Sequence, residues 1–166
     1  WTAVSGATSY DVYRATQVPG YSFVASPTTN SYNDSPVSAG QTYVYIVRAV
    51  TNDGTSGFSD PDAATTILFT DPTLNSSVLV KAIHLAEIRQ AVNAMRAAAG
   101  LVAATFSPAT AGTIIQRAHI VEARDALDEA RTAIGLPGIG YTDPIITAGA
   151  TTVKAAHFTG LRQGTQ

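Results

Sequence analysis

Three segments in the second half of the chain repeat one pattern of residues, and this repetition is the strongest constraint on the fold. Each segment starts with an aromatic residue that has a proline within three positions, and each later carries a histidine with an arginine five residues beyond it. The histidines are His84, His119 and His157, at spacings of 35 and 38 residues. Periods of this length are typical of stacked helical repeats. We therefore expect residues 69–166 to form a small α-helical repeat module.

Apolar residues recur at alternating spacings of three and four residues after the first two histidines. This spacing places each set on one face of an α-helix. The two stripes are Leu85, Ile88, Val92, Met95 and Ala99 in the first unit, and Ile120, Ala123, Leu127, Ala130 and Ile134 in the second. We expect two long helices and a shorter third one, packed as an αα-hairpin against the extended segments that lead into them. The units are residues 69–105, 106–140 and 141–166.

The first half of the chain alternates large and polar residues, as half-buried β-strands do. The strands predicted on this basis are residues 9–14, 21–25, 31–34 and 42–50. Asp53 and Gly54 follow the last strand and favour a tight hairpin turn, because glycine adopts a positive φ without a steric penalty. Short strands at roughly ten-residue spacing indicate an antiparallel β-sandwich.

The order of aromatic, glycine and serine residues over 1–67 resembles a fibronectin type III domain. The residues that carry the resemblance are Trp1, Tyr10, Val12, Tyr13, Tyr32, Asp34, Gly40, Tyr43, Tyr45, Val47, Ala49, Gly54, Ser56 and Ser59. The resemblance implies an immunoglobulin-like β-sandwich in which Trp1 belongs to the second strand and the Tyr43 hydroxyl ties down a loop. It also implies that the first strand and most of the second, which precede this tryptophan in the family, are missing here. An incomplete sandwich exposes a sheet edge and part of its core, which favours pairing with another chain. Either the sequence begins after these strands, or a neighbour supplies them.

The second half resembles a repeat found toward the C-termini of large secreted bacterial multidomain proteins. The residues concerned are an aromatic-Thr-Asp-Pro lead, as in Phe69 to Pro72, a Lys-Ala-x-His core and a following Leu-Arg. The expected fold class is therefore multidomain β plus α. A fibronectin type III-like β-sandwich at 1–67 is followed by a helical repeat module at 69–166.

Composition excludes several functional classes. Charged residues make up 13% of the chain, about half the usual share of roughly 25%, and the net charge of −2 is too balanced for a general nucleic-acid binder. The chain has no cysteine, which excludes disulfides and thiolate chemistry. It has no apolar run long enough to span a membrane. Sparse charge and abundant Ser and Thr favour a secreted or bacterial cell-surface location.

The three histidines are the candidate metal ligands. His84 and Glu87, like His119 and Glu122, lie on one face of a helix, but the third unit has Gly160 in place of the glutamate. We therefore expect no metal and no other cofactor. If the chain does bind a metal ion, its candidate ligands are His84, His119, His157, Asp71 and Asp143. The two aspartates would then be oxygen ligands for calcium. In the favoured interpretation each histidine bonds a backbone carbonyl of the neighbouring lead.

The sequence carries no catalytic signature. It has no nucleophile elbow, zinc-protease, Walker or dinucleotide-binding motif, and we predict that the chain is not an enzyme. Aromatic side chains offer another option, because tyrosines that share an exposed face can stack on sugar rings. The tyrosines in question are Tyr10, Tyr13, Tyr21, Tyr32, Tyr43 and Tyr45.

The function predicted from these patterns is that of a non-catalytic structural or adhesive module that acts through protein–protein assembly, up to a polymer or filament. Its partners would be other copies of the chain or neighbouring modules, with no nucleic acid. The expected assembly residues are Trp1, Tyr10 and Val12 in the incomplete sandwich, and Leu85, Ile88, Ile120 and Leu127 in the helical seam. The alternative is a carbohydrate-binding or spacer module of a secreted glycoside hydrolase, with polysaccharide as the partner.

Overall fold

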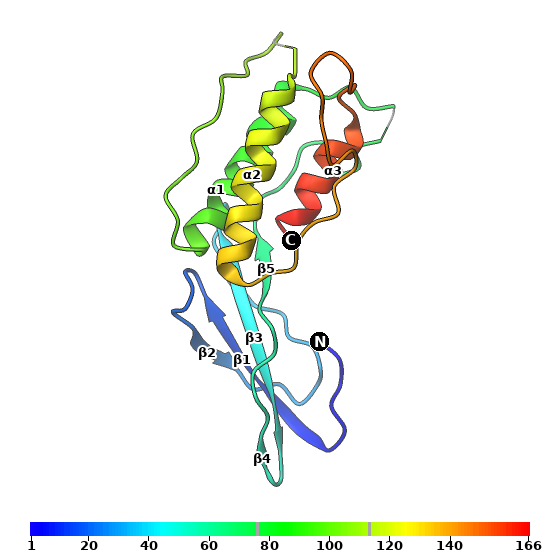
Figure 1. The fold of residues 1–166 in the computed structure, drawn as a ribbon. Helices are drawn as coiled ribbons and strands as arrows, with labels where there is room; N and C mark the ends of the chain where they lie inside the picture. The colour runs from blue at the N-terminus through cyan, green and yellow to red at the C-terminus, as the bar shows by residue number, and fades with distance from the viewer. Residues whose placement is uncertain (76, 113) are drawn as a thin grey trace.

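A computed structural model of residues 1–166 describes the whole chain except residues 76 and 113. An antiparallel β-sheet formed by the first half of the chain is followed by three α-helices (Figure 1). The strands are β1 (Ala7–Ala15), β2 (Ser22–Ala25), β3 (Thr42–Thr51), β4 (Gly54–Thr55) and β5 (Asp62–Thr65). The helices are α1 (Ala82–Ala98), α2 (Arg117–Ile134) and α3 (Ala155–Gly164). The sheet and the helices lie end to end.

The two long strands β1 and β3 form the centre of the sheet. They pair antiparallel over most of their length, with Val12 opposite Val47. Strand β2 pairs with β1, and β4 and β5 both pair with β3. The predicted hairpin is confirmed, since Thr51 pairs with Gly54 across the turn and Gly54 has a φ of 135°. Alternation therefore located the central strands and their turn correctly.

The strand predicted at 31–34 is wrong. The segment is irregular, and the Asp34 carboxylate binds the side chains of Arg14 and Tyr45. Strand β5, which the sequence analysis did not predict, consists of Asp62 to Thr65, and its small residues pair with the first half of β3. All strands within the described residues belong to one sheet, so the second layer of a sandwich is represented only by irregular segments.

The helices are present where the apolar periodicity predicted them. Most of the stripe residues are buried, including Leu85 and Ile88 on α1 and Ile120 and Leu127 on α2. Helix α3 is the shorter one, it packs against both α1 and α2, and its Phe158 is fully buried. The three helices thus pack on one another, which extends the expected helical pair into a three-helix group. Among the helices of the described residues, none combines the length and the apolar character needed to cross a membrane.

One apolar core continues from the helices into the end of the sheet. Val44 of β3 and Ala63 of β5 belong to the same buried cluster as Ile88 and Met95 of α1. The Val18 N–H donates a hydrogen bond of 2.8 Å to the Ala98 carbonyl at the end of α1. The two halves of the chain therefore meet through buried side chains and a backbone hydrogen bond.

Candidate functional site

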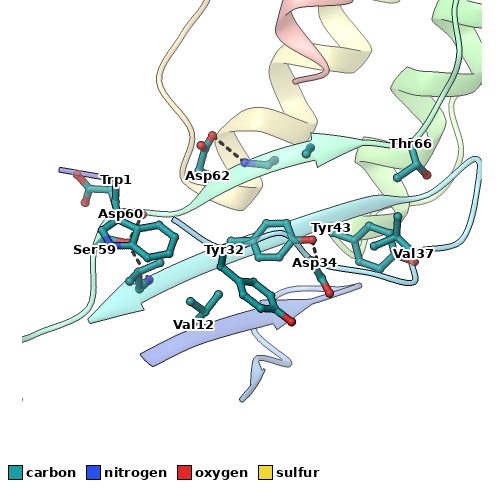
Figure 2. Close-up of a pocket in the computed structure, with 14 residues that line it drawn as sticks. Trp1, Val12, Tyr32, Asp34, Val37, Tyr43, Ser59, Asp60, Asp62 and Thr66 are labelled. Atoms are coloured by element: carbon teal, nitrogen blue, oxygen red, sulfur yellow. Dashed lines mark hydrogen bonds between the residues drawn. The ribbon is translucent and has the colours of Figure 1, made fainter. Parts of the chain in front are cut away.

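One face of the sheet carries a hollow of about 510 Å³ (Figure 2). Because side chains alternate along a strand, Val12 of β1 and Tyr43, Tyr45 and Val47 of β3 all lie on this face. The rim is formed by residues outside the strands, among them Trp1, Tyr32, Val37, Ser59 and Asp60. The lining is mainly apolar, with a few polar groups, which is the usual character of a binding site.

Two tyrosine hydroxyls hold irregular segments against this face. The Ser38 N–H donates a hydrogen bond of 2.9 Å to the Tyr43 hydroxyl, which confirms the expected tie between this tyrosine and a loop. The Val4 N–H donates a 2.8 Å bond to the Tyr10 hydroxyl in the same manner. The segment before β1 and the segment between β2 and β3 are thus anchored by side chains of the sheet.

Asp34 is the charged centre of the hollow. Its Oδ2 accepts hydrogen bonds from Arg14 Nη1 at 2.7 Å and from the Tyr45 hydroxyl at 2.8 Å. Burial, and next the hydrogen bond to Asp34, raises the pKa of Tyr45 above its ordinary value. The hydrogen bond to Asp34 also raises the pKa of Arg14, whose guanidinium lies 4.9 Å from the Tyr43 ring centroid. The carboxylate is therefore already neutralised by a partner in the same chain.

The predicted sandwich residues Trp1, Tyr10 and Val12 lie together at this site, at different depths. Trp1 is 41% exposed, and its ring lies 5.6 Å from that of Tyr10. Tyr10 and Val12 are buried beneath it. Trp1 is not part of a strand, contrary to the family resemblance, since β1 begins at Ala7. Only Trp1 of these three is accessible to a partner.

The four residues predicted for the helical seam are not exposed on the surface of the chain. Leu85, Ile88, Ile120 and Leu127 are at most 1% exposed, because α1 and α2 turn their stripes toward each other and α3 packs against both helices. The apolar seam residues are covered by other helices of the same chain. The expectation that another subunit covers these residues is therefore corrected.

His84 and His157 share one arrangement. Nδ1 of His84 accepts the backbone N–H of Lys81 (3.2 Å) at the start of α1, so its Nε2 carries the proton and donates to Asp71 Oδ2 at 3.0 Å. His157 makes the same contacts with Lys154 (3.3 Å) and Asp143 (2.9 Å) at the start of α3.

His119 also accepts the N–H of its N-cap residue, Gln116, at 3.1 Å. All three histidines are buried. The expected bond to a backbone carbonyl is corrected, because the partner of His84 and of His157 is a carboxylate.

The metal-ligand candidates are thus engaged with one another and with helix starts. Asp71 binds Lys81 as well as His84, and Asp143 binds Lys154 as well as His157. The hydrogen bond from His84, and then that from Lys81, lowers the pKa of Asp71, while that from Lys154, and then that from His157, lowers the pKa of Asp143. No group of three or more His, Asp or Glu side chains converges within the part of the chain that the structure describes.

The glutamates that share a helix face with the histidines point elsewhere. Both oxygens of Glu87 accept the Thr70 N–H at 3.0 Å, and Glu122 accepts the Ser107 N–H at 2.8 Å. Each glutamate thereby fastens the extended segment that leads into its own helix. A shared role of these carboxylates could have been predicted from the sequence, because each glutamate follows its histidine by three residues.

An arginine on each helix contacts an aromatic residue of another segment, a connection that the sequence analysis did not make. The contacts between guanidinium carbon and ring centroid are Arg89 to Phe106 at 5.0 Å, Arg124 to Tyr141 at 4.5 Å and Arg162 to Phe69 at 4.5 Å. We call this set the arginine cycle, because the first two run to the next segment and the third returns to the first. The arginine five residues after each histidine and the aromatic residue of each lead were both visible as repeated positions.

Comparison with known proteins gives matches over part of the chain. A poly(3-hydroxybutyrate) depolymerase from Ralstonia pickettii is 48% identical over 64 residues, which are 39% of this chain and 12% of the relative. An amylopullulanase from Thermoanaerobacter thermohydrosulfuricus is 46% identical over 56 residues, 32% of this chain and 4% of the relative. The chain thus spans only a small fraction of the length of these relatives.

Among solved structures, an Fn3-like protein from Clostridium thermocellum is 37% identical, with 38% of this chain and 68% of that chain covered and a TM-score of 0.36. No family model matches the chain. The curated matches concern a segment that, in each relative, is part of a much longer protein.

Proposed function

We propose that this chain is a non-catalytic part of a larger extracellular polymer-degrading protein. In this proposal residues 1–67 form a fibronectin type III-like module, and residues 69–166 form three units of one helical repeat. Two relatives whose names describe enzymes support the context, since the matching segment is a small part of each. The recurring histidine and arginine contacts support the assignment of three units.

The role we propose for the sheet is to bind a second β-layer on its hollowed face. The observation that carries this proposal is the hollow itself, an apolar sheet face on which Trp1, Tyr32 and Val37 remain between 38% and 41% exposed. In a β-sandwich such a face is covered by the side chains of a second sheet. Burial of these apolar groups would provide the driving force for association.

The polar groups of the hollow favour a protein layer over a sugar. The hydroxyls of Tyr10, Tyr43 and Tyr45 each already make a hydrogen bond within the chain, so each has less capacity left for sugar hydroxyls. Asp34 is paired with Arg14, so covering this face leaves no unpaired charge buried there. Asp60 and Asp62 lie exposed at the rim, where they stay hydrated.

We infer that a second copy of the chain is the layer that binds the hollow. Two identical single sheets that meet face to face form a symmetric two-layer sandwich, and such isologous contacts are the commonest kind in homodimers. The proposal predicts that the 166-residue chain forms dimers through this face.

Light scattering over a range of protein concentrations tests the proposal. We expect the wild-type mass to rise to twice the 17.2 kDa of the monomer, and Val37→Asp at the rim of the hollow to remain monomeric. The matched control is Val102→Asp, because Val102 is an exposed valine outside the sheet, and this variant should dimerise like the wild type. A wild-type chain that stays monomeric at every concentration, or equal association of the Val37→Asp variant, would overturn the proposal.

A further inference from the structure

We propose that the opposite face of the same sheet carries a binding site for a neutral polysaccharide. The residues are Tyr13 on β1, Phe23 on β2, Phe58 after β4, and the ion pair of Arg48 with Asp11. Asp11 and Tyr13 alternate with Val12 along β1, and Arg48 follows Val47 on β3, so these side chains lie away from the hollow. The site therefore lies on the other face of the sheet, and Phe58 is at its edge, where it also lines a small pocket with Trp1 and Val47.

Three aromatic rings form a fixed group on this face. The ring of Tyr13 lies 5.6 Å from that of Phe23 at an interplanar angle of 76°, and 5.1 Å from that of Phe58 at 86°. These edge-to-face contacts are the preferred geometry of aromatic pairs. Phe23 is 56% exposed and Phe58 is 51% exposed. The rings are thus held in place by one another while much of their surface remains open to solvent.

Polar groups accompany the rings in defined positions. The Arg48 guanidinium lies 5.5 Å from the Tyr13 ring centroid and 5.4 Å from that of Phe58. Its Nε and Nη2 both bind Asp11 Oδ2, at 3.0 and 2.9 Å, and Ser26 donates a 3.0 Å bond to the other Asp11 oxygen. A guanidinium has five N–H donors, so two bonds to Asp11 leave donors that can bind a ligand.

This combination fits a sugar chain better than other ligands. A pyranose ring has an apolar C–H side, which can lie against an exposed aromatic ring, and hydroxyls at its edge, which need donors and acceptors in fixed places. The charges of Arg48 and Asp11 cancel, so the site does not attract an anionic polymer. The apolar area is limited to three rings beside Ser9, Asp11 and Ser26, which is small for a stable protein–protein interface.

Affinity electrophoresis in gels that contain soluble starch or hydroxyethyl cellulose tests the proposal. We expect at least one of these neutral polysaccharides to retard the wild-type chain. Phe23→Ala and Phe58→Ala should each weaken binding about tenfold, as expected for the loss of one stacked ring. Tyr32→Ala is the matched control, since Tyr32 is a partly exposed aromatic residue of the hollow, and it should bind as the wild type does.

Thermal unfolding of each variant verifies that it is folded. If one phenylalanine variant does not fold, the other still tests the proposal. Absence of retardation by both polysaccharides would overturn the proposal, as would full binding by both phenylalanine variants. Loss of binding in Tyr32→Ala alone would place the sugar in the hollow and would also overturn it. Dimerisation through the hollow is measured separately, so either proposal can fail without the other.

Discussion

The guanidinium of Arg162 stacks on the ring of Phe69, 4.5 Å from its centroid, although the two residues are 93 positions apart in the sequence. Its Nη1 and Nη2 donate bonds of 2.8 Å to the carbonyls of Asp71 and Thr70. Arg124 binds the carbonyls of Asp143 and Thr142 in the same way beside Tyr141. The last helix is thus fastened to the segment that precedes the first helix, and the arginine cycle is closed.

The first prediction concerns the strength of this closure. Arg162→Ala removes two charge-assisted hydrogen bonds and a cation–π contact, so we expect the free energy of unfolding to fall by roughly 2–4 kcal/mol. Arg89→Ala is the matched comparison and should cost less, about 1 kcal/mol, because Arg89 Nε and Nη2 are buried without a hydrogen-bond partner. Urea unfolding of both variants measures the difference. Equal losses would show that the backbone contacts of Arg162 contribute nothing.

The second prediction concerns acid. The pKa values of Asp71 and Asp143 lie below the ordinary value of 3.8, so both carboxylates stabilise the fold above that pH. The stabilisation is lost as the pH falls through the lower folded-state pKa, because the unfolded chain binds the protons more readily. We expect the urea midpoint to decrease steeply below a pH of about 4.

The Asp71→Asn, Asp143→Asn double variant is the test of this assignment. Both positions have a positive φ, of 50° and 48°, and asparagine tolerates this conformation as aspartate does. The urea midpoint of the double variant should vary less with pH in the acid range than the urea midpoint of the wild type. Glu122 keeps part of the dependence: burial raises its pKa, but hydrogen bonds from Ser107 and the charges of Arg89 and His119 outweigh this and lower it. An unchanged acid profile would contradict the role of the two aspartates.

The third prediction compares two glycines of α3. A Cβ at Gly164 would lie 2.2 Å from Ile139 Cδ1 and 2.8 Å from Leu127 Cδ2, whereas the nearest atom to a Cβ at Gly160 is Tyr141 Cδ1 at 3.7 Å. We expect Gly164→Ala to lower the free energy of unfolding by about 1–3 kcal/mol through overpacking. Gly160→Ala should raise it by about 0.5–1 kcal/mol, because alanine is the better helix former. Thermal or urea unfolding gives both signs, and a stabilising Gly164→Ala would refute the close packing.

The fourth prediction concerns the loop tie at Tyr43. Tyr43→Phe removes the hydroxyl that accepts the Ser38 N–H and leaves the buried ring in place. Since water can replace the lost acceptor at the exposed Ser38, the cost should be about 1 kcal/mol. Tyr32→Phe is the control, at a partly exposed ring, and should be neutral. A neutral Tyr43→Phe would mean that the loop is held by its other contacts.

Local patterns were sufficient to predict the elements that one segment can specify alone. Spacings of three and four residues identified α1 and α2, and alternation identified β1 and β3, because burial of one face imposes those periods. Strand β5 was missed because it has only four residues, and its buried Ala63 and exposed Ala64 are the same residue type, so the sequence shows no alternation there. The segment 31–34 was misassigned because its Asp34 serves a side-chain network instead of a strand ladder.

Contacts between distant segments could not be predicted in the same way. The apolar stripes indicated that something covers Leu85 and Ile120, but a stripe is the same whether its partner is in the same chain or another. The histidines were correctly placed beside the stripes, yet their spacing did not specify Asp71 and Asp143 as partners. For the sheet, the residues that line the hollow were largely named in advance, whereas Phe23 and Phe58 became visible only when the strands were paired.

The closed arginine cycle restricts how a gene for such a chain can change in length. In an open stack of repeats each unit contacts only its neighbours, so duplication of one unit lengthens the stack without disturbing the others. Here Arg162 of the third segment must reach Phe69 of the first. In the three-unit assignment proposed above, an extra unit inserted between them would displace α3 from that ring and leave Arg162 without its backbone carbonyls.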